Sequence, residues 1–463
     1  MGGTHYDAIV IGAGFSGLAA GIRLAQFEKK VVVLERHALW GGLNSFYKRA
    51  GRRLDTGLHA LTNFTPASAK SAPLAKIVRQ LRIDRDALHL GEQTYSEIVF
   101  PSARLEFANG GARLAESVAA AFPAERDRFA VLVERVRAED AFDASAPPRS
   151  ARAELASALR EPLLCDMLLC AVCYYGSARE DDVDWRDFVV LFRSIFLEGF
   201  ARPEGGIKTL LDVLVRRYAE LGGELRMHSG VARIVRDSHG AAGVVLDDGT
   251  ELSAERVFSS AGLRETLALA GETLDEGGAP RLSFLESTWV TREPQRALGH
   301  GATITFFSTQ DRFRYARPDG LVDVTSGVVC CSDNYATNRA PSEGVLRVTV
   351  PAHAERWLAL APGEYAREKA RCVDAAASVA SRFVPDPRPR SVFHDAFTPR
   401  TIVHYTSHHA GAIYGSPVKR RDGRTGIENL FVIGTDQGLV GIVGALLSGI
   451  TMANQHALVA ARS

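Results

Sequence analysis

Three glycines near the start of the chain have the spacing of a phosphate-binding turn. Gly12, Gly14 and Gly17 form a Gly-x-Gly-x-x-Gly pattern, which by itself also fits an ordinary glycine-rich turn. An apolar, β-branched run at 6–11 precedes them, and residues 16–26 carry apolar side chains at helical spacing. In a strand, turn and helix of this order, the first glycine permits the turn and the second lets a pyrophosphate approach the backbone. The third lets the helix pack against the strand, and its free N–H groups face the anion.

A carboxylate follows the next predicted strand. Residues 31–34 are apolar and end at Glu35, which lies 18 residues beyond Gly17. A carboxylate at about this distance accepts hydrogen bonds from the 2′-hydroxyl of an adenosine ribose. The sequence therefore predicts a dinucleotide site, and the alternative is a βαβ unit without a ligand.

Length and charge limit the possible partners. A chain of 463 residues exceeds the usual size of one domain, so two domains with large cores are expected. The net charge of +1 offers no broad basic surface, and we expect no nucleic-acid partner. One dense basic cluster, residues 419–424, is typical of a solvated turn, with a contact to anionic lipid or to a partner protein as the alternative.

No signal peptide precedes the first predicted strand, which favours a cytoplasmic location. The most apolar segments, 161–176 and 188–200, are short and contain Asp166 and Arg193, so we expect no transmembrane segment. Both segments could line an apolar cavity or touch a membrane surface, which leaves a peripheral membrane contact open. The oligomeric state stays open as well.

Three cysteines have the spacing of an iron–sulfur motif. Cys165, Cys170 and Cys173 form C-x4-C-x2-C, and Cys330 or Cys331 could supply a fourth ligand. The residues between them are apolar and at helical spacing, whereas a cluster needs amides from an open loop. We therefore predict thiols of a buried helix and no metal site.

The elements that must position the dinucleotide come from separated parts of the chain. Residues 110–200 are mostly helical in pattern, with a loop or inter-helix linker at 137–152. A helix is expected at about 206–221, a strand that ends by Val235, and then a hairpin with a primed turn at Asp248-Gly249. These elements would extend the first sheet.

Strand-like runs dominate residues 276–424, and the chain ends with a strand, a glycine-rich turn and a long helix. The fold class is therefore α/β, a discontinuous Rossmann-type domain with an inserted α+β substrate domain. The expected bounds are 1–95, 205–275 and 425–463 for the first domain, and 96–204 and 276–424 for the second. A long cofactor gripped at both ends, such as a flavin, suits this arrangement better than a nicotinamide.

The order of these motifs resembles that of FAD-dependent oxidoreductases of the phytoene desaturase and amine oxidase type. The resemblance spans nearly the whole chain and rests on the first glycine pattern, "WGGLNSFYKRAGRRLDTGLHAL", "RPEGGIKTL" and the C-terminal glycine-rich helix. Within that group, "DTGLHAL", "GAIYGS" and "GTDQGLVGIVGALLSG" resemble elements of the carotenoid isomerase and retinol saturase branch.

The resemblance implies FAD as the cofactor and assigns residues to it. The pyrophosphate lies at the first glycine turn, Glu35 binds the ribose, Arg36 flanks the adenine, and the backbone of Val231 reads the adenine. Related proteins commonly place Arg or Lys where this chain has Leu43 and Asn44, so this chain lacks that cation near the cofactor. Asp436 lies near the ribityl–phosphate region, and the helix after it starts against the flavin ring. The full predicted set is Gly12, Gly14, Phe15, Ser16, Gly17, Glu35, Arg36, Gly41, Gly42, Leu43, Asn44, Val231, Gly434, Asp436, Gly441 and Gly444.

Two residues are candidates for catalysis. His59 lies in a motif expected close to the flavin, and Tyr414 could donate a hydrogen bond or wall the cavity with its ring. For both, a structural role is the alternative. Several aromatic residues could supply a dry pocket or belong to the ordinary core: Phe188, Phe192, Phe196, Phe200, Trp289, Phe306 and Phe307.

These features favour an FAD-dependent oxidoreductase. The expected reaction dehydrogenates, saturates or isomerises a carbon–carbon bond of a lipophilic polyene or terpenoid-like substrate, with dehydrogenation first. Oxidation of an amine is one alternative. The other is a non-enzymatic chaperone for prenylated partners, similar to Rab GDP-dissociation inhibitors, which lack the complete flavin cradle.

Overall fold

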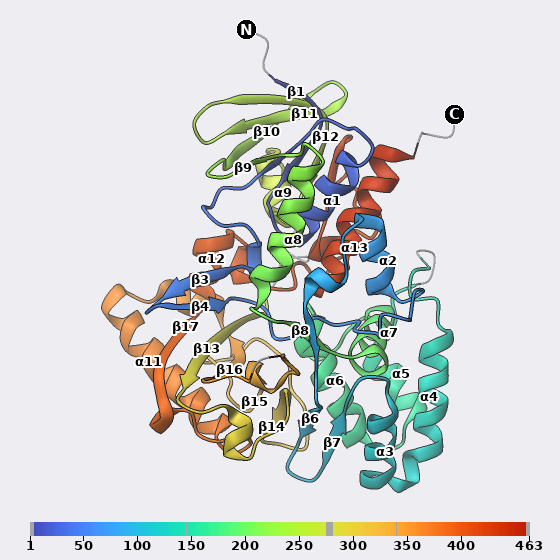
Figure 1. Ribbon diagram of the computed structural model, residues 1–463, viewed down its shortest axis with the longest axis vertical. Helices are drawn as coiled ribbons and strands as arrows, with labels where there is room; N and C mark the ends of the chain where they lie inside the picture. Colours follow the sequence, from blue (N-terminus) through green and yellow to red (C-terminus); the bar gives the residue numbers. More distant parts are fainter. Residues whose placement is uncertain (1–3, 144–146, 275–280, 339, 460–463) are drawn as a thin grey trace.

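The computed structural model describes residues 4–143, 147–274, 281–338 and 340–459. It has two large sheets, one toward each end of the long axis, with helices around both (Figure 1). The helices are α1 (Phe15–Ala25), α2 (Pro73–Leu81), α3 (Ala112–Ala121), α4 (Arg126–Ala138), α5 (Ala151–Ala158), α6 (Pro162–Gly176), α7 (Trp185–Phe192), α8 (Ile207–Glu220), α9 (Leu263–Leu269), α10 (Ala354–Ala359), α11 (Pro362–Ala380), α12 (Pro399–Thr406) and α13 (Gly441–Ala453).

The first sheet has the strand order β10-β11-β12-β1-β2-β9, and β18 pairs with β12. In the series β12, β1, β2 and β9, each strand is parallel to its neighbour, and β18 is parallel to β12. Strands β10, β11 and β12 form an antiparallel meander. The strands are β1 (His5–Ile11), β2 (Val31–Leu34), β9 (Glu224–Arg226), β10 (Val231–Asp237), β11 (Gly240–Leu246), β12 (Glu251–Ser259) and β18 (Leu430–Val432).

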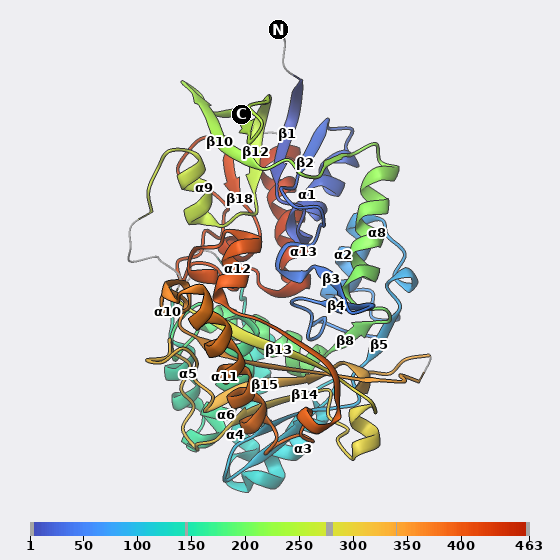
Figure 2. The same ribbon diagram turned by 90° about the vertical axis from the view of Figure 1, so that its left-hand side faces the viewer.

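Helix α1 lies between this sheet and the C-terminal helix α13 (Figure 2). The two helices approach closely because Gly449 of α13 has no side chain. A Cβ there would lie 2.1 Å from the carbonyl oxygen of Ser16. Gly21 on another side of α1 likewise faces Val33 and Tyr218 at 2.9 and 3.1 Å. The first and the last segments of the chain therefore form one core, with α8 beside it.

The second sheet has the order β17-β13-β16-β15-β14-β6-β7. Alternate residues of its strands face two different cores, as the period of two requires. Phe306 packs with helices α3 to α7 on one face, and its neighbour Phe307 packs toward α11 on the other. The strands are β6 (Ser96–Val99), β7 (Arg104–Phe107), β13 (Ser283–Thr291), β14 (Ile304–Ser308), β15 (Ser326–Cys331), β16 (Gly344–Ala352) and β17 (Ser391–Phe397).

Two small strand pairs lie between the sheets: β3 (Phe46–Arg49) with β4 (Arg52–Asp55), and β5 (Leu90–Glu92) with β8 (Ala201–Pro203). They carry the chain from the first sheet toward the second (Figure 1). The predicted "DTGLHAL" motif begins at the end of β4, so it follows directly from this junction.

Most of the predicted elements are confirmed, as is the α/β class. The strand at 31–34, the first helix, α8 and the C-terminal strand and helix lie where the pattern predicts them, and β9 to β12 extend the first sheet. Residues 137–152 connect α4 to α5, apart from 144–146, which lie outside the described residues. The proposed domain bounds stay a prediction.

Two expectations about local structure are wrong, and one long helix was not predicted. The single strand expected before Val235 is two strands, β9 and β10, which pair with different neighbours. The hairpin exists, but its turn is not of the primed type. Turns of types I′ and II′ both need a positive φ at their first central residue, Asp248, and only Gly249 has a positive φ. The region 276–424 also contains the 19-residue helix α11, which the strand-like pattern did not predict.

Candidate flavin site

The first glycine turn is built so that two of its glycines have no substitute. Gly12 has φ +95°, and a Cβ there would lie 2.2 Å from Oγ of Ser260. A Cβ on Gly17 would lie 1.9 Å from the carbonyl oxygen of Gly12. Gly14 is different, because the nearest atom to its added Cβ is the carbonyl oxygen of Gly41 at 4.0 Å. The space in front of Gly14 is therefore open to a ligand.

The second glycine turn lies against the first. Gly41 donates its N–H to the carbonyl oxygen of Ala13 at 2.9 Å, and a Cβ on Gly42 would lie 3.7 Å from the Cα of Gly14. The sequence predicted both turns as cofactor contacts, and the structure brings them together. Leu43 and Asn44 follow in a short 3-10 turn, and the carbonyl oxygen of Leu43 accepts the hydroxyl of Thr56 at 2.9 Å.

The N-terminus of α1 has no side-chain cap, and neither has that of α13. Phe15 and Ser16 begin α1, and both are buried. The N-terminal turn of a helix carries about half a positive charge together with free N–H groups. These two ends therefore fit the pyrophosphate and the electron-accepting ring of a flavin dinucleotide, and the open face of Gly14 fits the same ligand.

The C-terminal glycines have separate functions. A Cβ on Gly434 would lie 3.1 Å from Oγ of Ser16, so the turn after β18 reaches the start of α1. Gly441 opens α13 with φ +73°, and the space beside it is open. Gly444 packs against the backbone of Leu439, where a Cβ would lie 2.9 Å from the carbonyl carbon. Of these three glycines, only Gly441 offers open space to a cofactor.

The end of β2 places the Glu35 carboxylate beside the first glycine turn. The carboxylate of Glu35 is buried and accepts the N–H groups of Ala13 at 2.9 Å and His37 at 3.0 Å. The carbonyl oxygen of Glu35 accepts the N–H of Ser229 at 2.8 Å, two residues before Val231. The structure therefore places Glu35 and Val231 on adjacent segments, as the prediction of an adenosine site requires.

Arg36 has partners at the C-terminal end of α12. Its guanidinium donates to Oγ of Ser407 and to the carbonyl oxygen of His404, the latter at 3.4 Å. His37 makes a similar contact with the carbonyl oxygen of Tyr405 at 2.8 Å. The proposed place of Arg36 beside the adenine stays a prediction.

Asp436 holds two loops together. Its carboxylate accepts the N–H of Leu263, the first residue of α9, at 2.5 Å and the N–H of Ser416 at 2.6 Å. A Cβ on Gly415 would lie 2.0 Å from the same carboxylate, so the "GAIYGS" motif needs this glycine. The two motifs that the sequence singled out, "GAIYGS" and "GTDQG", thus meet at one side chain.

His59 lies in a buried polar network that the sequence did not predict. Its Nε2 lies 2.8 Å from Oε2 of Glu286 on β13 and 3.3 Å from Oγ1 of Thr349 on β16. Glu286 also accepts Nε of Arg347 at 2.6 Å, and only 3% of the Glu286 side chain is exposed. Burial alone would raise the pKa of the Glu286 carboxyl, but the facing Arg347 guanidinium and the His59 ring hold that pKa below its usual value.

The ionised carboxylate fixes the tautomer of His59. A carboxylate only accepts hydrogen bonds, so the hydrogen lies on Nε2, and in the neutral ring Nδ1 is left as an acceptor. The side chain is 18% exposed. The ring is thus held at Nε2 by Glu286.

Two arginines anchor the backbone of the same motif. Arg347 donates to the carbonyl oxygens of Thr56 and Leu58, the second at 2.6 Å. Arg202 donates to the carbonyl oxygen of Leu58 at 2.7 Å and to Asp55 at 2.5 Å. Arg202 belongs to the "RPEGGIKTL" motif, which the sequence analysis used only as evidence for the family. Arg202 therefore links the two motifs through Asp55 and the carbonyl oxygen of Leu58.

Tyr414 lies among aromatic side chains. Its hydroxyl donates to the carbonyl oxygen of Tyr174, and its ring meets Phe284 edge-on at 6.1 Å. Burial raises the pKa of the hydroxyl well above its usual range, so it stays protonated. Tyr414 therefore lies beside the same core as α6, and its catalytic role stays a prediction.

The predicted aromatic residues separate into two groups. Phe188, Phe192, Phe196, Phe200 and Phe306 belong to the core under α6 and α7. Trp289 and Phe307 belong to the core under α11, on the far face of the second sheet. The last two therefore cannot line a pocket that opens toward the glycine turns.

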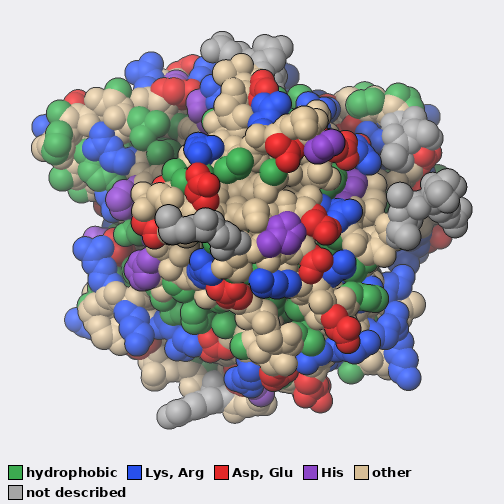
Figure 3. Space-filling view, turned by 90° about the horizontal axis from the view of Figure 1, so that it is seen from above, with side chains coloured by type: hydrophobic (Ala, Val, Ile, Leu, Met, Phe, Trp, Pro, Cys, Tyr) green, Lys and Arg blue, Asp and Glu red, His purple; other side chains and the backbone are tan. Residues whose placement is uncertain are grey.

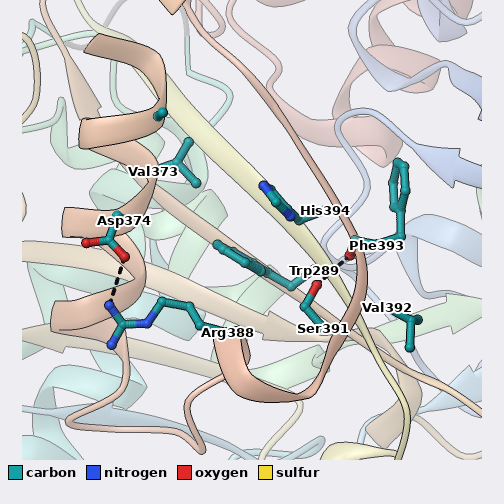
Figure 4. Close-up of a pocket in the computed structure, with 9 residues that line it drawn as sticks. Trp289, Val373, Asp374, Arg388, Ser391, Val392, Phe393 and His394 are labelled. Carbon is teal, nitrogen blue, oxygen red and sulfur yellow. Dashed lines mark hydrogen bonds and ion pairs between the residues drawn. The ribbon is translucent and has the colours of Figure 1, made fainter. Parts of the chain in front are cut away.

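Trp289 instead lines a groove of about 510 Å³ between α11 and β17, with Arg388 and His394 among the other residues (Figure 4). The Trp289 and His394 rings stack there at 4.7 Å, and Arg388 pairs with Asp374. This groove contains none of the predicted cofactor residues.

The basic cluster at 419–424 forms a turn, with Gly423 at φ +72°, but its cations are not simply solvated. Lys419 donates to the carbonyl oxygen of Tyr414 at 2.6 Å, and burial lowers the pKa of its amine. Arg421 pairs with Asp187 at 2.8 Å. Seen from the end that carries the first sheet, charges of both signs are interspersed over the surface (Figure 3).

The three cysteines of the iron–sulfur pattern are free thiols in the buried core of α6, as predicted. Burial raises the pKa of Cys165 to about 11 and that of Cys170 well above its usual range. Within the described residues, no group of three His, Cys, Asp or Glu side chains is arranged to hold a metal ion. None of the helices in that part of the chain is long and apolar enough to cross a bilayer.

The two-sheet fold, the paired glycine turns and the open space at Gly14 fit the cofactor of a flavin-dependent oxidoreductase. The chain belongs to the family of flavin-containing amine oxidoreductases, whose model matches residues 15–455. An oxidoreductase from Methanosarcina mazei has the same fold, with a TM-score of 0.68 over 96% of this chain and 99% of that one, at 18% identity.

Two curated proteins show which branch of the family is similar. All-trans-retinol 13,14-reductase of Danio rerio is 24% identical over 96% of this chain and 85% of its own length. Phytoene desaturase (neurosporene-forming) of Rhodobacter capsulatus is 27% identical over 55% of this chain. The match covers 52% of that desaturase, so the chain spans about half of its length. The predicted resemblance to carotenoid- and retinoid-type enzymes is confirmed.

Proposed function

We propose that the protein binds FAD and transfers hydride between the flavin and a carbon–carbon bond of a lipophilic polyene or terpenoid-like substrate. Dehydrogenation is the reaction proposed first, with saturation and isomerisation as variants of the same chemistry. The flavin would supply the redox step. The protein would bind the substrate, orient it, exclude water and move a proton at His59.

The observation that carries this proposal is the neutral character of the site around His59. The two carboxylates there, Asp55 and Glu286, are each paired with a buried or nearly buried arginine, Arg202 and Arg347. A cationic amine would meet no unpaired carboxylate among these groups, whereas an uncharged polyene needs none. Partly exposed apolar or aromatic side chains lie against the same core: Ala60, Tyr175, Ile413, Tyr414 and Val440.

The named relatives support the same substrate class. One is a phytoene desaturase and another is a retinol 13,14-reductase, so both names refer to polyenes. We propose that the turn of Gly12, Gly14 and Gly17 holds the pyrophosphate and that the backbone of Gly41 and Gly42 approaches the ribityl chain and flavin. Glu35 would bind the ribose, and the start of α13 would face the flavin ring. The helix end would stabilise the negative charge of a reduced flavin without a charged side chain.

The first test is the absorption spectrum of the purified protein, followed by identification of the cofactor released on denaturation. We expect the bands of an oxidised flavin, and FAD in the released fraction. Anaerobic mixing should then bleach the flavin with a polyene and not with a primary amine. Bleaching by amines alone would move the assignment to amine oxidation, and a colourless protein that takes up no added FAD would favour a binding chaperone.

A further inference from the structure

One hydroxyl at the proposed site lacks the partner that its burial demands. The hydroxyl of Tyr175, near the end of α6, is fully buried and makes no hydrogen bond within the described residues. A buried polar group that is left unpaired is costly, and native proteins pair nearly all of them. The unpaired Tyr175 hydroxyl is therefore expected to have a partner that is not part of the described chain.

The groups around this hydroxyl are already engaged. Tyr335 and Cys330 both donate to the carbonyl oxygen of His59, each at 3.4 Å. Tyr414 donates to the carbonyl oxygen of Tyr174, and Arg202 binds Asp55. The hydroxyls of Tyr335 and Tyr414 keep acceptor lone pairs after donating. Within the described residues, however, no acceptor lies within hydrogen-bond distance of the Tyr175 hydroxyl.

The ring cannot easily turn to find another partner. It stacks on Phe200 with the ring centroids 5.0 Å apart and tilts against Phe306 at 5.7 Å. Although its neighbours in α6 are buried, the Tyr175 residue as a whole is only partly buried. The residue is therefore partly accessible although its hydroxyl is not.

The position of Tyr175 is next to both predicted ends of the reaction site. The adjacent Gly176 packs against Val440, since a Cβ there would lie 2.5 Å from a methyl carbon of Val440. Val440 immediately precedes α13, whose N-terminus is proposed to face the flavin ring. Tyr175 also packs against the core that contains Tyr335 and Cys330, and both of these donate to the carbonyl oxygen of His59.

We propose that the Tyr175 hydroxyl donates a hydrogen bond to a neutral oxygen, a hydroxyl or a carbonyl, on the substrate. This inference rests on the proposed function and narrows it to oxygen-bearing polyenes. A carboxylate is disfavoured, because Arg202 and Arg347 are already paired with Asp55 and Glu286, and a further buried anion would lack a counter-charge. Burial raises the pKa of Tyr175 well above its usual range, which keeps the donor hydrogen in place.

The test compares two ligands that differ in one oxygen. The FAD-loaded protein is titrated with all-trans-retinol and with the hydrocarbon that has hydrogen in place of the retinol hydroxyl, and the change in the flavin spectrum gives each dissociation constant. We expect the wild type to favour retinol about fivefold to tenfold. Tyr175→Phe should remove this preference and bind the hydrocarbon at least as well as the wild type does.

A matched control is Tyr315→Phe. The Tyr315 hydroxyl is also buried, but it donates to the carbonyl oxygen of Ser177 at 3.1 Å. Tyr315→Phe should lower the melting temperature of the apoprotein and keep the preference for retinol. Tyr175→Phe should leave the melting temperature unchanged or raise it, because no hydrogen bond is lost.

The outcomes separate the two proposals. If both ligands bind equally well to the wild type, or if Tyr175→Phe keeps the preference, the inference about Tyr175 is wrong and the proposed function stands. If neither ligand changes the flavin spectrum, the proposed function fails and the inference fails with it. If Tyr175→Phe mainly weakens FAD binding, the hydroxyl serves the cofactor, and the inference is again overturned.

Discussion

His59 and Glu286 join the segment after the small β3–β4 pair to the second large sheet. The histidine follows β4 in the N-terminal segment, the glutamate lies on β13 of the second sheet, and Nε2 of the ring is 2.8 Å from the carboxylate. Arg347 on the adjacent β16 completes the contact from the side opposite to the ring. The motif that follows the second glycine turn is thus fixed by charges that belong to the substrate side of the fold.

Glu286→Gln should destabilise the protein strongly. The substitution leaves the charge of Arg347 buried without its counter-charge, and breaking a buried pair in this way costs about 3–5 kcal/mol of unfolding free energy. Urea unfolding of the apoprotein measures the change. The control is Glu343→Gln, which breaks the exposed pair with Arg52 and should cause only a small loss. Equal losses of unfolding free energy in the two variants would mean that the buried Glu286 pair contributes no more to stability than the exposed pair does.

The deficit of Glu286→Gln should depend on pH. The pKa of Glu286 is lowered in the folded protein, so its contribution to stability is fully present above the carboxyl's usual pKa of about 4.5. It is lost as the pH falls through the lower folded value. Unfolding free energies of the wild type and the variant should therefore converge below about pH 4.5. A difference that grows on acidification would contradict the lowered pKa.

The sequence predicted the cofactor turns but not this charged cluster, for a physical reason. Glycine spacing is a local signal, and it identified three positions where glycine matters. A Cβ on Gly12 or Gly17 would overlap neighbouring atoms, and Gly14 faces open space. The cluster is formed by pairing between strands, in which Thr349 lies opposite Glu286. That register cannot be read from either strand alone.

A weaker signal for the cluster was nevertheless present. Glu286 and Arg347 are single charges within two otherwise apolar or hydroxyl-bearing strands, "SFLESTWVT" and "GVLRVTVPA". A charge inside such a strand demands a partner, and these two charges are of opposite sign. The helix α11 also had a signal, since Cys372, Ala376 and Ala380 recur at every fourth residue after Pro362.

Gly14→Val should remove FAD from a protein that still folds. The space in front of Gly14 is open, so a side chain there meets the cofactor rather than the protein. The matched variant is Gly17→Ala, whose single methyl group would overlap the carbonyl oxygen of Gly12 and should prevent stable folding. Circular dichroism and the flavin content after gel filtration separate the two effects. A Gly14→Val protein that retains FAD with unchanged affinity would refute the proposed pyrophosphate site.

Asp436→Asn tests whether this carboxylate supports the cofactor through the protein backbone. Each oxygen of the carboxylate accepts a hydrogen bond from a backbone N–H group, one at the start of α9 and one in the "GAIYGS" loop. An amide group would turn one donor toward another N–H, so we expect a loss of about 1–3 kcal/mol in the unfolding free energy of the apoprotein. FAD retention should fall as well, because the loop and the turn before α13 would lose their common anchor. The exposed Asp422→Asn in the nearby turn is the control, and both quantities should stay unchanged in that variant. Loss of FAD with full stability of the apoprotein would instead mean that Asp436 binds the cofactor directly.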